Sequence, residues 1–263
     1  MKLSEKKLFL LDMDGTIYLD TDLFDGTLDF LSCVKEKGGK YLYLTNNSSK
    51  SAKAYVDKLG KIGIEASEDE FLTSTYATIL YIKEKYSGRR FYSLGTASFT
   101  QELRDAGIDA VTELCDGIDG IVMGNDNELT FKKLEDACKL LLNDIIYIAT
   151  NPDWVCPTAF GYVPDCGSFA EMLFRATGKR PKFIGKPEPS MIELALSKFG
   201  YKKEEAVMIG DRLYTDIASG YNAGIDTIFV LSGEGTMKDL EESEVKPTYV
   251  MKNIREVYDN IKE

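Results

Sequence analysis

The stretch Leu8-Phe9-Leu10-Leu11-Asp12-Met13-Asp14-Gly15-Thr16 decides the fold. Its four consecutive apolar residues are typical of a strand buried on both faces of a parallel sheet. Asp12 and Asp14 follow directly, and strand side chains two residues apart point to the same side. In open α/β sheets, ligands bind at the carboxyl ends of the strands. Asp and Gly also form turns, so the stretch alone favours chemistry only modestly.

The overall composition is that of a soluble globular chain with room for two domains. It has 263 residues, of which 44% are hydrophobic and 29% charged. No apolar run approaches the roughly 20 residues of a membrane span, so we expect no membrane partner. The N-terminus has no long apolar stretch, which predicts a cytoplasmic protein without a signal peptide. The net charge of −11 argues against nucleic acid as a partner, because phosphate backbones attract basic surfaces.

Histidine and cysteine usage excludes several enzyme classes. The chain contains no histidine, which rules out Ser-His-Asp hydrolases, histidine phosphatases and His-ligated zinc enzymes. Its five cysteines are scattered and form no C-x-x-C pair, so we expect free thiols in a reducing compartment. Proton transfer must then fall to carboxylates, lysines, tyrosines or cysteines.

Short apolar strands alternate with helices at both ends of the chain. This alternation predicts an α/β fold with a doubly wound parallel sheet. In the N-terminal part we expect a second strand at 41–44 and helices at 27–37 and 49–59. In the C-terminal part we expect strands at 183–184, 206–209, 227–231 and 249–251, helices at 189–199 and 216–222, and a final charged helix.

The middle of the chain reads as a separate inserted α/β domain. It has its own strand candidates at 90–94, 120–123 and 145–150, and helix candidates at 98–106, 131–142 and 168–177, the second capped by Thr130. We therefore predict a core of residues 1–75 and 182–263, and an inserted domain of residues 76–181.

A second polar segment, Thr45-Asn46-Asn47-Ser48-Ser49, also follows an apolar strand and precedes a helix. Backbone N–H groups at a helix start attract anions, and hydroxyl and amide groups add neutral donors. We assign Thr45 to binding phosphate oxygens. Capping of the helix by Ser48 or Ser49 is the structural alternative.

Two further segments complete the pattern. Gly185-Lys186-Pro187 places a lysine at a strand end, where its cation could neutralise a nucleophile and a phosphoryl group together. Gly210-Asp211 and Asp216 place two carboxylates five residues apart, and Mg²⁺ prefers such oxygen ligands. The alternatives are a turn aspartate for Asp211 and a helix N-cap for Asp216, and Arg212 could form only a surface ion pair. We expect all four segments at the strand ends of one sheet.

This set of motifs, in this order, resembles the haloacid dehalogenase (HAD) superfamily of phosphohydrolases. The insertion between Thr45 and Lys186 resembles a C2-type cap. Thr150-Asn151-Pro152-Asp153 and its downstream glycines resemble subfamily IIA, the NagD-like phosphatases. That group usually has a glycine after the proline that corresponds to Pro164, and this chain has Asp165-Cys166 there. The vitamin B6 phosphatases of this group use a cap histidine, which this chain lacks.

The resemblance implies a phosphatase that hydrolyses small phosphomonoesters such as nucleoside monophosphates or sugar phosphates. It implies an aspartyl-phosphate intermediate on a nucleophilic aspartate, a carboxyl group that exchanges protons, and Mg²⁺ as cofactor. The implied catalytic residues are Asp12, Asp14, Thr45 and Lys186. The implied substrate-binding residues are Gly15, Asn46 and Asn47. For the metal site, the resemblance implies that Asp12, the backbone carbonyl of Asp14 and Asp211 hold the metal, and that Asp216 supports the metal or its waters.

Further implications concern the inserted domain and the partners. The resemblance implies that the cap acts as a lid, that a small phosphorylated metabolite is the partner, and that the chain forms a homodimer. A phosphate-binding or regulatory protein without turnover is the alternative. A mutase is less favoured, because only thirty residues lie between Asp14 and Thr45, too few for the small cap of those enzymes.

Overall fold

The computed structural model describes residues 2–158 and 160–262, and these form two compact units. Unit 1 contains the described residues of Met1–Thr45, Lys53–Leu72 and Lys186–Glu263, and unit 2 contains Asn46–Ala52 and Thr73–Gly185. Within the described residues, no helix has the length and apolar character needed to cross a bilayer.

Unit 1 is built on a parallel sheet with β1 at its centre. Among the described residues, the strand order is β15-β14-β13-β1-β4-β5. The strands are β1 (Leu8–Leu11), β4 (Lys40–Thr45), β5 (Phe71–Thr73), β13 (Ala206–Gly210), β14 (Asp226–Val230) and β15 (Tyr249–Met251). β1 pairs in parallel with β13 on one side and β4 on the other. All four residues of β1 are buried, as their apolar run predicts.

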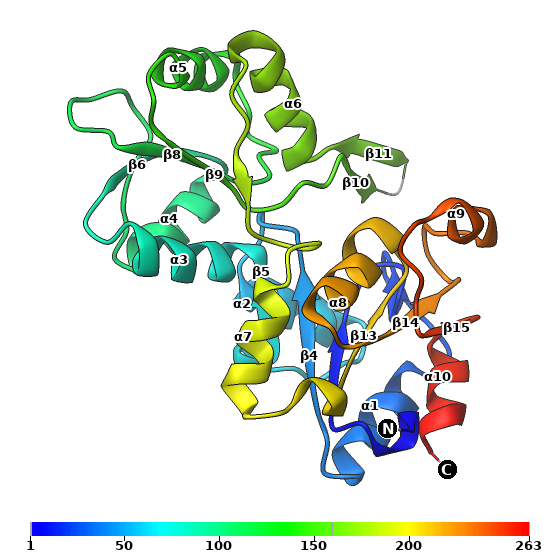
Figure 1. The fold of residues 1–263 in the computed structure, drawn as a ribbon. Helices are drawn as coiled ribbons and strands as arrows, with labels where there is room; N and C mark the ends of the chain where they lie inside the picture. The colour runs from blue at the N-terminus through cyan, green and yellow to red at the C-terminus, as the bar shows by residue number, and fades with distance from the viewer. Residues whose placement is uncertain (1, 159, 263) are drawn as a thin grey trace. The chain divides into compact units, whose positions relative to one another are not determined.

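Two pairs of helices in unit 1 pack against each other beside this sheet. The helical segments are η1 (Leu3–Glu5), α1 (Thr27–Glu36), α2 (Ala52–Lys61), η2 (Glu68–Glu70), α7 (Ser190–Phe199), η3 (Lys203–Glu205), η4 (Leu213–Ile217), α8 (Ala218–Ala223), α9 (Met237–Glu242) and α10 (Ile254–Ile261). α1 packs against α10, and α7 packs against α8 (Figure 1). α1 lies in the connection from β1 to β4, and α8 lies in the connection from β13 to β14, so the two crossovers lead away from the centre of the sheet in opposite directions. Right-handed crossovers then place α1 and α8 on opposite faces of the sheet. The predicted doubly wound α/β core is confirmed. A small hairpin of β2 (Tyr18–Leu19) and β3 (Asp22–Leu23) follows β1.

Unit 2 has a parallel sheet of its own, with the strand order β12-β9-β8-β6-β7 among the described residues. Its strands are β6 (Arg90–Leu94), β7 (Asp109–Val111), β8 (Gly120–Met123), β9 (Ile146–Ala149) and β12 (Lys182–Phe183), with a separate hairpin of β10 (Val155–Thr158) and β11 (Gly161–Pro164). Its helices are α3 (Ser74–Lys85), α4 (Ala97–Asp105), α5 (Phe131–Leu141) and α6 (Cys166–Thr177). α5 and α6 cover one face, and α3 and α4 lie on the other (Figure 1).

The bounds of the units differ from the predicted division at three places. Unit 2 begins at Thr73 and ends at Gly185, rather than at 76 and 181, and it also includes residues 46–52. The predicted strand at 183–184 lies at 182–183 and pairs with β9 of unit 2. The expectation that all four motifs follow strands of one sheet is therefore wrong for Lys186, which follows the edge strand of the other sheet.

Local capping confirms some predictions and corrects others. Thr130 caps α5, and Gly224 ends α8 with a left-handed backbone. α2 begins only at Ala52, so neither Ser48 nor Ser49 is its N-cap. The expected helix at 216–222 starts instead with a π-helical turn that contains Asp216. Asp165 is the N-cap of α6, and its carboxylate accepts a hydrogen bond from the Cys166 N–H at 2.5 Å.

Candidate active site

Three aspartates that the sequence singles out meet in unit 1. Asp12 follows β1, and Asp211 and Asp216 follow the neighbouring strand β13. One carboxylate oxygen from each lies within 4.8 Å of the others. Asp211 and Asp216 are each 1% exposed, so their charges have little contact with water. This cluster is the central feature of the site.

Lys186 contributes the ammonium group that faces this cluster. Its side chain is 2% exposed, and its Nζ donates to Asp12 Oδ1 at 2.6 Å and to Asp216 Oδ1 at 2.7 Å. It also donates to the Leu44 carbonyl at 3.0 Å, near the end of β4. Burial alone would lower the pKa of the ammonium, but the carboxylates of Asp12 and Asp216 outweigh burial and raise it. Lys186 is therefore charged between two of the aspartates.

The charge balance of the cluster fits a divalent cation. Burial and the nearby Asp216 carboxylate raise the pKa of Asp12 well above its usual range, although Lys186 opposes this shift. Burial and Asp216 also raise the pKa of Asp211 to about 6. Burial is the larger cause of both shifts and the like charge of Asp216 adds to it, so a further cation beside the two carboxylates would favour their charged forms. Carboxylate oxygens are the donors that Mg²⁺ prefers, and it needs only one or two of them.

A loop that the sequence analysis missed holds Asp211 in place. Residues 232–235 follow β14, and the backbone N–H of Glu234 donates to Asp211 Oδ2 at 2.7 Å. The N–H of Gly235 donates to the Asp211 carbonyl at 3.0 Å. A Cβ on Gly233 would lie 1.9 Å from Asp211 Oδ2. The signal for this loop was Ser-Gly-Glu-Gly directly after an apolar strand.

Gly15 also packs against the Asp211 carboxylate. Its φ is +87°, and a Cβ there would lie 2.5 Å from Asp211 Oδ2. Its carbonyl accepts a hydrogen bond from Ser232 Oγ at 2.8 Å. The structure therefore gives Gly15 a packing role, and its assignment to substrate binding stays a prediction.

The carboxylate of Asp14 points to a different set of partners. Its Oδ1 accepts a hydrogen bond from Lys58 Nζ at 3.2 Å, and its Oδ2 accepts one from the Tyr18 hydroxyl at 3.1 Å. Its side chain is 39% exposed. The Asp14 side chain is thus outside the three-aspartate cluster, and the predicted metal contact through its backbone carbonyl stays a prediction. Neither Lys58 nor Tyr18 was singled out from the sequence, because neither belongs to a motif.

The polar segment after β4 is divided between the two units. Thr45 is buried at the end of β4, the strand next to β1. Asn46 belongs to unit 2, where its Nδ2 donates to Asp153 Oδ1 at 3.0 Å. Asn47 Oδ1 accepts the N–H and the hydroxyl of Ser49. The roles predicted for Thr45, Asn46 and Asn47 in phosphate and substrate binding stay predictions.

Arg212 pairs with a carboxylate of the loop that holds Asp211. Its Nε donates to Glu234 Oε2 at 2.8 Å, and its backbone N–H donates to Asp216 Oδ2 at 3.1 Å. Its side chain is 15% exposed, so the ion pair is more buried than the predicted surface pair. Arg212 thus ties the loop to the segment that carries Asp211 and Asp216.

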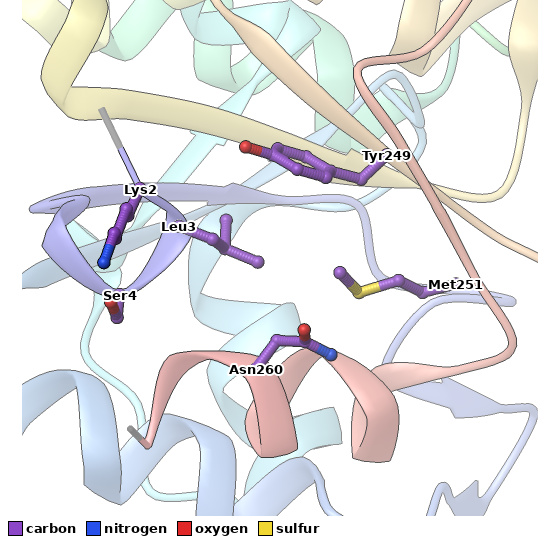
Figure 2. A pocket seen from close by; sticks show the side chains of 6 residues that line it. All are labelled: Lys2, Leu3, Ser4, Tyr249, Met251 and Asn260. Atoms are coloured by element: carbon purple, nitrogen blue, oxygen red, sulfur yellow. The ribbon is translucent and has the colours of Figure 1, made fainter.

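A cavity of about 500 Å³ lies elsewhere in unit 1. η1, β15 and α10 contribute its lining, and Figure 2 shows Tyr249, Met251 and Asn260 around it. Its other lining residues are Lys2, Leu3 and Ser4. None of the clustered aspartates lines this cavity, so the cavity offers none of the chemistry described above.

A doubly wound sheet with buried aspartates after its central strands, and a buried lysine that bonds two of them, defines a haloacid dehalogenase-like phosphohydrolase. The sequence models of two such families match this chain. The haloacid dehalogenase-like hydrolase model covers residues 9–109, and a HAD-hydrolase-like model covers residues 183–257.

Individual proteins of known name agree with this class. An acid sugar phosphatase of Staphylococcus aureus is 38% identical over 254 residues, which cover 97% of each chain. A 4-nitrophenylphosphatase from Thermotoga maritima is 41% identical with a TM-score of 0.92 over 98% of each chain. A glycerol phosphate phosphatase from Mycobacterium tuberculosis, solved with magnesium, is 28% identical with a TM-score of 0.91 over 98% of this chain and 78% of that one.

This chain belongs to the HAD superfamily, in its NagD-like subfamily IIA, and is a phosphatase of that class. The family predicted from the four motifs is confirmed.

Proposed function

We propose that this protein is a Mg²⁺-dependent phosphomonoesterase that forms an aspartyl-phosphate on Asp12. The observation that carries the proposal is the buried cluster of Asp12, Asp211 and Asp216 with Lys186 bridging two of them. Hydrogen bonding and burial alone do not require three acids in so small a volume. A nucleophilic carboxylate that receives a phosphoryl group, beside a cation site with one or two further carboxylates, accounts for all three.

In the first half of the reaction, a carboxylate oxygen of Asp12 attacks phosphorus. The bond from phosphorus to the leaving-group oxygen breaks, and its electron pair stays on that oxygen. Asp14 gives the leaving oxygen a proton. Covalent catalysis of this kind divides one hard displacement into two easier ones.

In the second half, the Asp14 carboxylate takes a proton from water while the water oxygen attacks phosphorus. The bond from phosphorus to Asp12 breaks, and inorganic phosphate and the free Asp12 carboxylate result. Lys186 keeps its proton throughout, because the flanking carboxylates raise its pKa. Its charge therefore compensates negative charge on Asp12 in both halves.

Asp12 and Asp211 would hold the Mg²⁺ with the backbone carbonyl of Asp14, and Asp216 would support the metal or its waters. When bound, Mg²⁺ would neutralise charge on the phosphoryl oxygens and so favour attack by an anionic carboxylate. Thr45, at the end of β4, would donate its hydroxyl to a phosphoryl oxygen. We assign Asn46 and Asn47 to the same substrate through their place in the chain directly after Thr45.

For the substrate we propose a small phosphomonoester, with sugar phosphates first and nucleoside monophosphates second. The support is that similar proteins are named acid sugar phosphatase, 4-nitrophenylphosphatase and glycerol phosphate phosphatase. A phosphate-binding protein without turnover is not favoured, because Asp12, Lys186 and Asp211 are all in place.

The test is phosphate release, with Mg²⁺ and with a chelator, from nitrophenyl phosphate, glycerol phosphates, sugar phosphates and nucleoside monophosphates. Asp12→Asn is the control. We expect release that needs Mg²⁺ and is lost in Asp12→Asn, and acid quenching should trap a phosphorylated Asp12 peptide in the active protein. Equal release with and without the metal would refute the metal assignment, and full activity of Asp12→Asn would refute the nucleophile.

A further inference from the structure

A lysine outside the four sequence motifs binds the carboxylate of Asp14. Lys58 Nζ lies 3.2 Å from Asp14 Oδ1 and 3.1 Å from the Tyr18 hydroxyl oxygen. The Tyr18 hydroxyl donates in turn to Asp14 Oδ2 at 3.1 Å. The three groups form a closed network in which each oxygen of the Asp14 carboxylate has its own donor. Rotation of the carboxylate would break at least one of these bonds.

Both donors are fixed by the surrounding structure. The Tyr18 side chain is fully buried, and the Tyr18 carbonyl accepts a hydrogen bond from the Gly15 N–H at 2.8 Å. Lys58 lies on α2, next in sequence to the buried Leu59 and about one turn after the buried Tyr55, and its side chain is 26% exposed. Its ammonium lies 4.2 Å from the centre of the Tyr18 ring, a distance at which a cation and an aromatic face attract.

We propose that Lys58 is a positioning residue for the reaction, which with the Tyr18 hydroxyl holds the Asp14 carboxyl group in the orientation for proton transfer to the leaving group. This inference rests on the proposed function, which makes Asp14 the proton carrier. Lys58 touches the carrier and not the reacting atoms. The two contacts to Asp14 also come from separate elements, α2 and the hairpin after β1, so the orientation is fixed from two sides.

The nature of the leaving group separates this role from a structural one. An alkoxide is a strong base and leaves phosphorus only when it receives a proton, whereas a nitrophenolate is stable without one. A misplaced proton carrier therefore slows alkyl phosphates and largely spares nitrophenyl phosphate. The ratio kcat/KM is the right quantity, because it covers events only up to the first irreversible step, the departure of the leaving group. The later hydrolysis of the aspartyl-phosphate does not affect it.

The experiment measures kcat/KM for glycerol phosphate and nitrophenyl phosphate in wild type, Lys58→Met, Lys58→Arg and Tyr18→Phe. Methionine keeps the length of the side chain over the Tyr18 ring and removes the charge. For Lys58→Met we expect a loss of about 10- to 100-fold on glycerol phosphate and less than about threefold on nitrophenyl phosphate. Lys58→Arg should recover most of the loss, since a guanidinium can also donate to the carboxylate. Lys61→Met, on the exposed side of the same helix, is the matched control and should equal wild type on both substrates.

Tyr18→Phe removes only the hydroxyl and keeps the buried ring, so it tests the network even if Lys58→Met unfolds. It should reduce kcat/KM on glycerol phosphate more than on nitrophenyl phosphate. Equal losses on both substrates, or no loss on either, would overturn the positioning role while an Mg²⁺-dependent wild type and an inactive Asp12→Asn leave the proposed function standing. An inactive wild type would refute the proposed function itself.

Discussion

Gly233→Ala should damage the proposed metal site, although Gly233 is not one of the proposed ligands. The new Cβ would lie 1.9 Å from Asp211 Oδ2 and 2.4 Å from Asp211 Cγ, whereas real Cβ contacts are essentially never below 3.0 Å. Either the carboxylate or the loop must therefore move by at least about 1.1 Å. The bond from the Glu234 N–H to Asp211 Oδ2, at 2.7 Å, cannot survive such a shift unchanged.

Two magnitudes follow from this displacement. A misplacement of about 1 Å at a catalytic group costs about 100-fold in rate. Loss of a hydrogen bond that orients a metal ligand costs about 10- to 100-fold in metal affinity. We expect both effects, measured as kcat at saturating Mg²⁺ and as Mg²⁺ affinity by calorimetry. Gly60→Ala on α2 is the matched control, because its Cβ would meet nothing within 4 Å and should leave both quantities unchanged. Wild-type Mg²⁺ affinity and kcat in folded Gly233→Ala would refute the claim that this loop holds Asp211.

Three other substitutions test the charges and the packing. Lys186→Met leaves the Asp12 and Asp216 carboxylates without their buried cation, so it should lower the free energy of unfolding by about 3–5 kcal/mol and kcat by at least about 100-fold. Added Mg²⁺ should raise the melting temperature of this variant more than that of wild type. Equal increases in the two proteins would contradict this account. Burial and Asp105 raise the pKa of Glu102 from 4.5 to about 7, so the folded state binds the extra proton and loses stability as pH rises from 4.5 to 7. Glu102→Gln should then be more stable than wild type at pH 8 by about 1 kcal/mol, discounted for partial exposure, with no difference at pH 4 in denaturant titrations; an equal gain at both pH values would exclude a titration effect. Gly167→Ala would place a Cβ 2.2 Å from the Pro152 carbonyl oxygen and should cost about 1–3 kcal/mol, whereas an unchanged unfolding midpoint would show that α6 can shift without loss.

The parts of the site that follow long apolar strands could be predicted from the sequence. β1 and β13 are buried runs with aspartates directly after them, and the parallel sheet brings those ends together. The pattern therefore gave both the sheet and the meeting of Asp12 with Asp211. Asp216 was also placed correctly in the cluster, although it lies in a π-helical turn, because the five-residue spacing limits how far it can be from Asp211.

The short strand before Lys186 shows where sequence patterns fail. β12 has only two residues, and it pairs with β9 in unit 2. Two residues carry no periodicity, so nothing in the sequence says which sheet they join. Lys186 does not follow a strand of the core sheet, but its side chain is long enough to reach Asp12. The sequence also does not show that residues 46–52 belong to unit 2, since this depends on side-chain hydrogen bonds. For example, Ser48 Oγ accepts a hydrogen bond from the Asn125 N–H at 2.8 Å.

Hydrogen bonds hold the aspartates in position, and glycines around them leave the space that the carboxylates occupy. A Cβ on Gly15 or Gly233 would collide with the Asp211 carboxylate, and a Cβ on Gly210 would lie 2.3 Å from that of Asp216. A sequence shows a glycine but not the atom that its missing Cβ would meet, and only one of these three has a left-handed φ that turn chemistry alone would demand. The charged residues of such a site are therefore readable from their chemistry, whereas the residues that hold them become visible only when the distances are known.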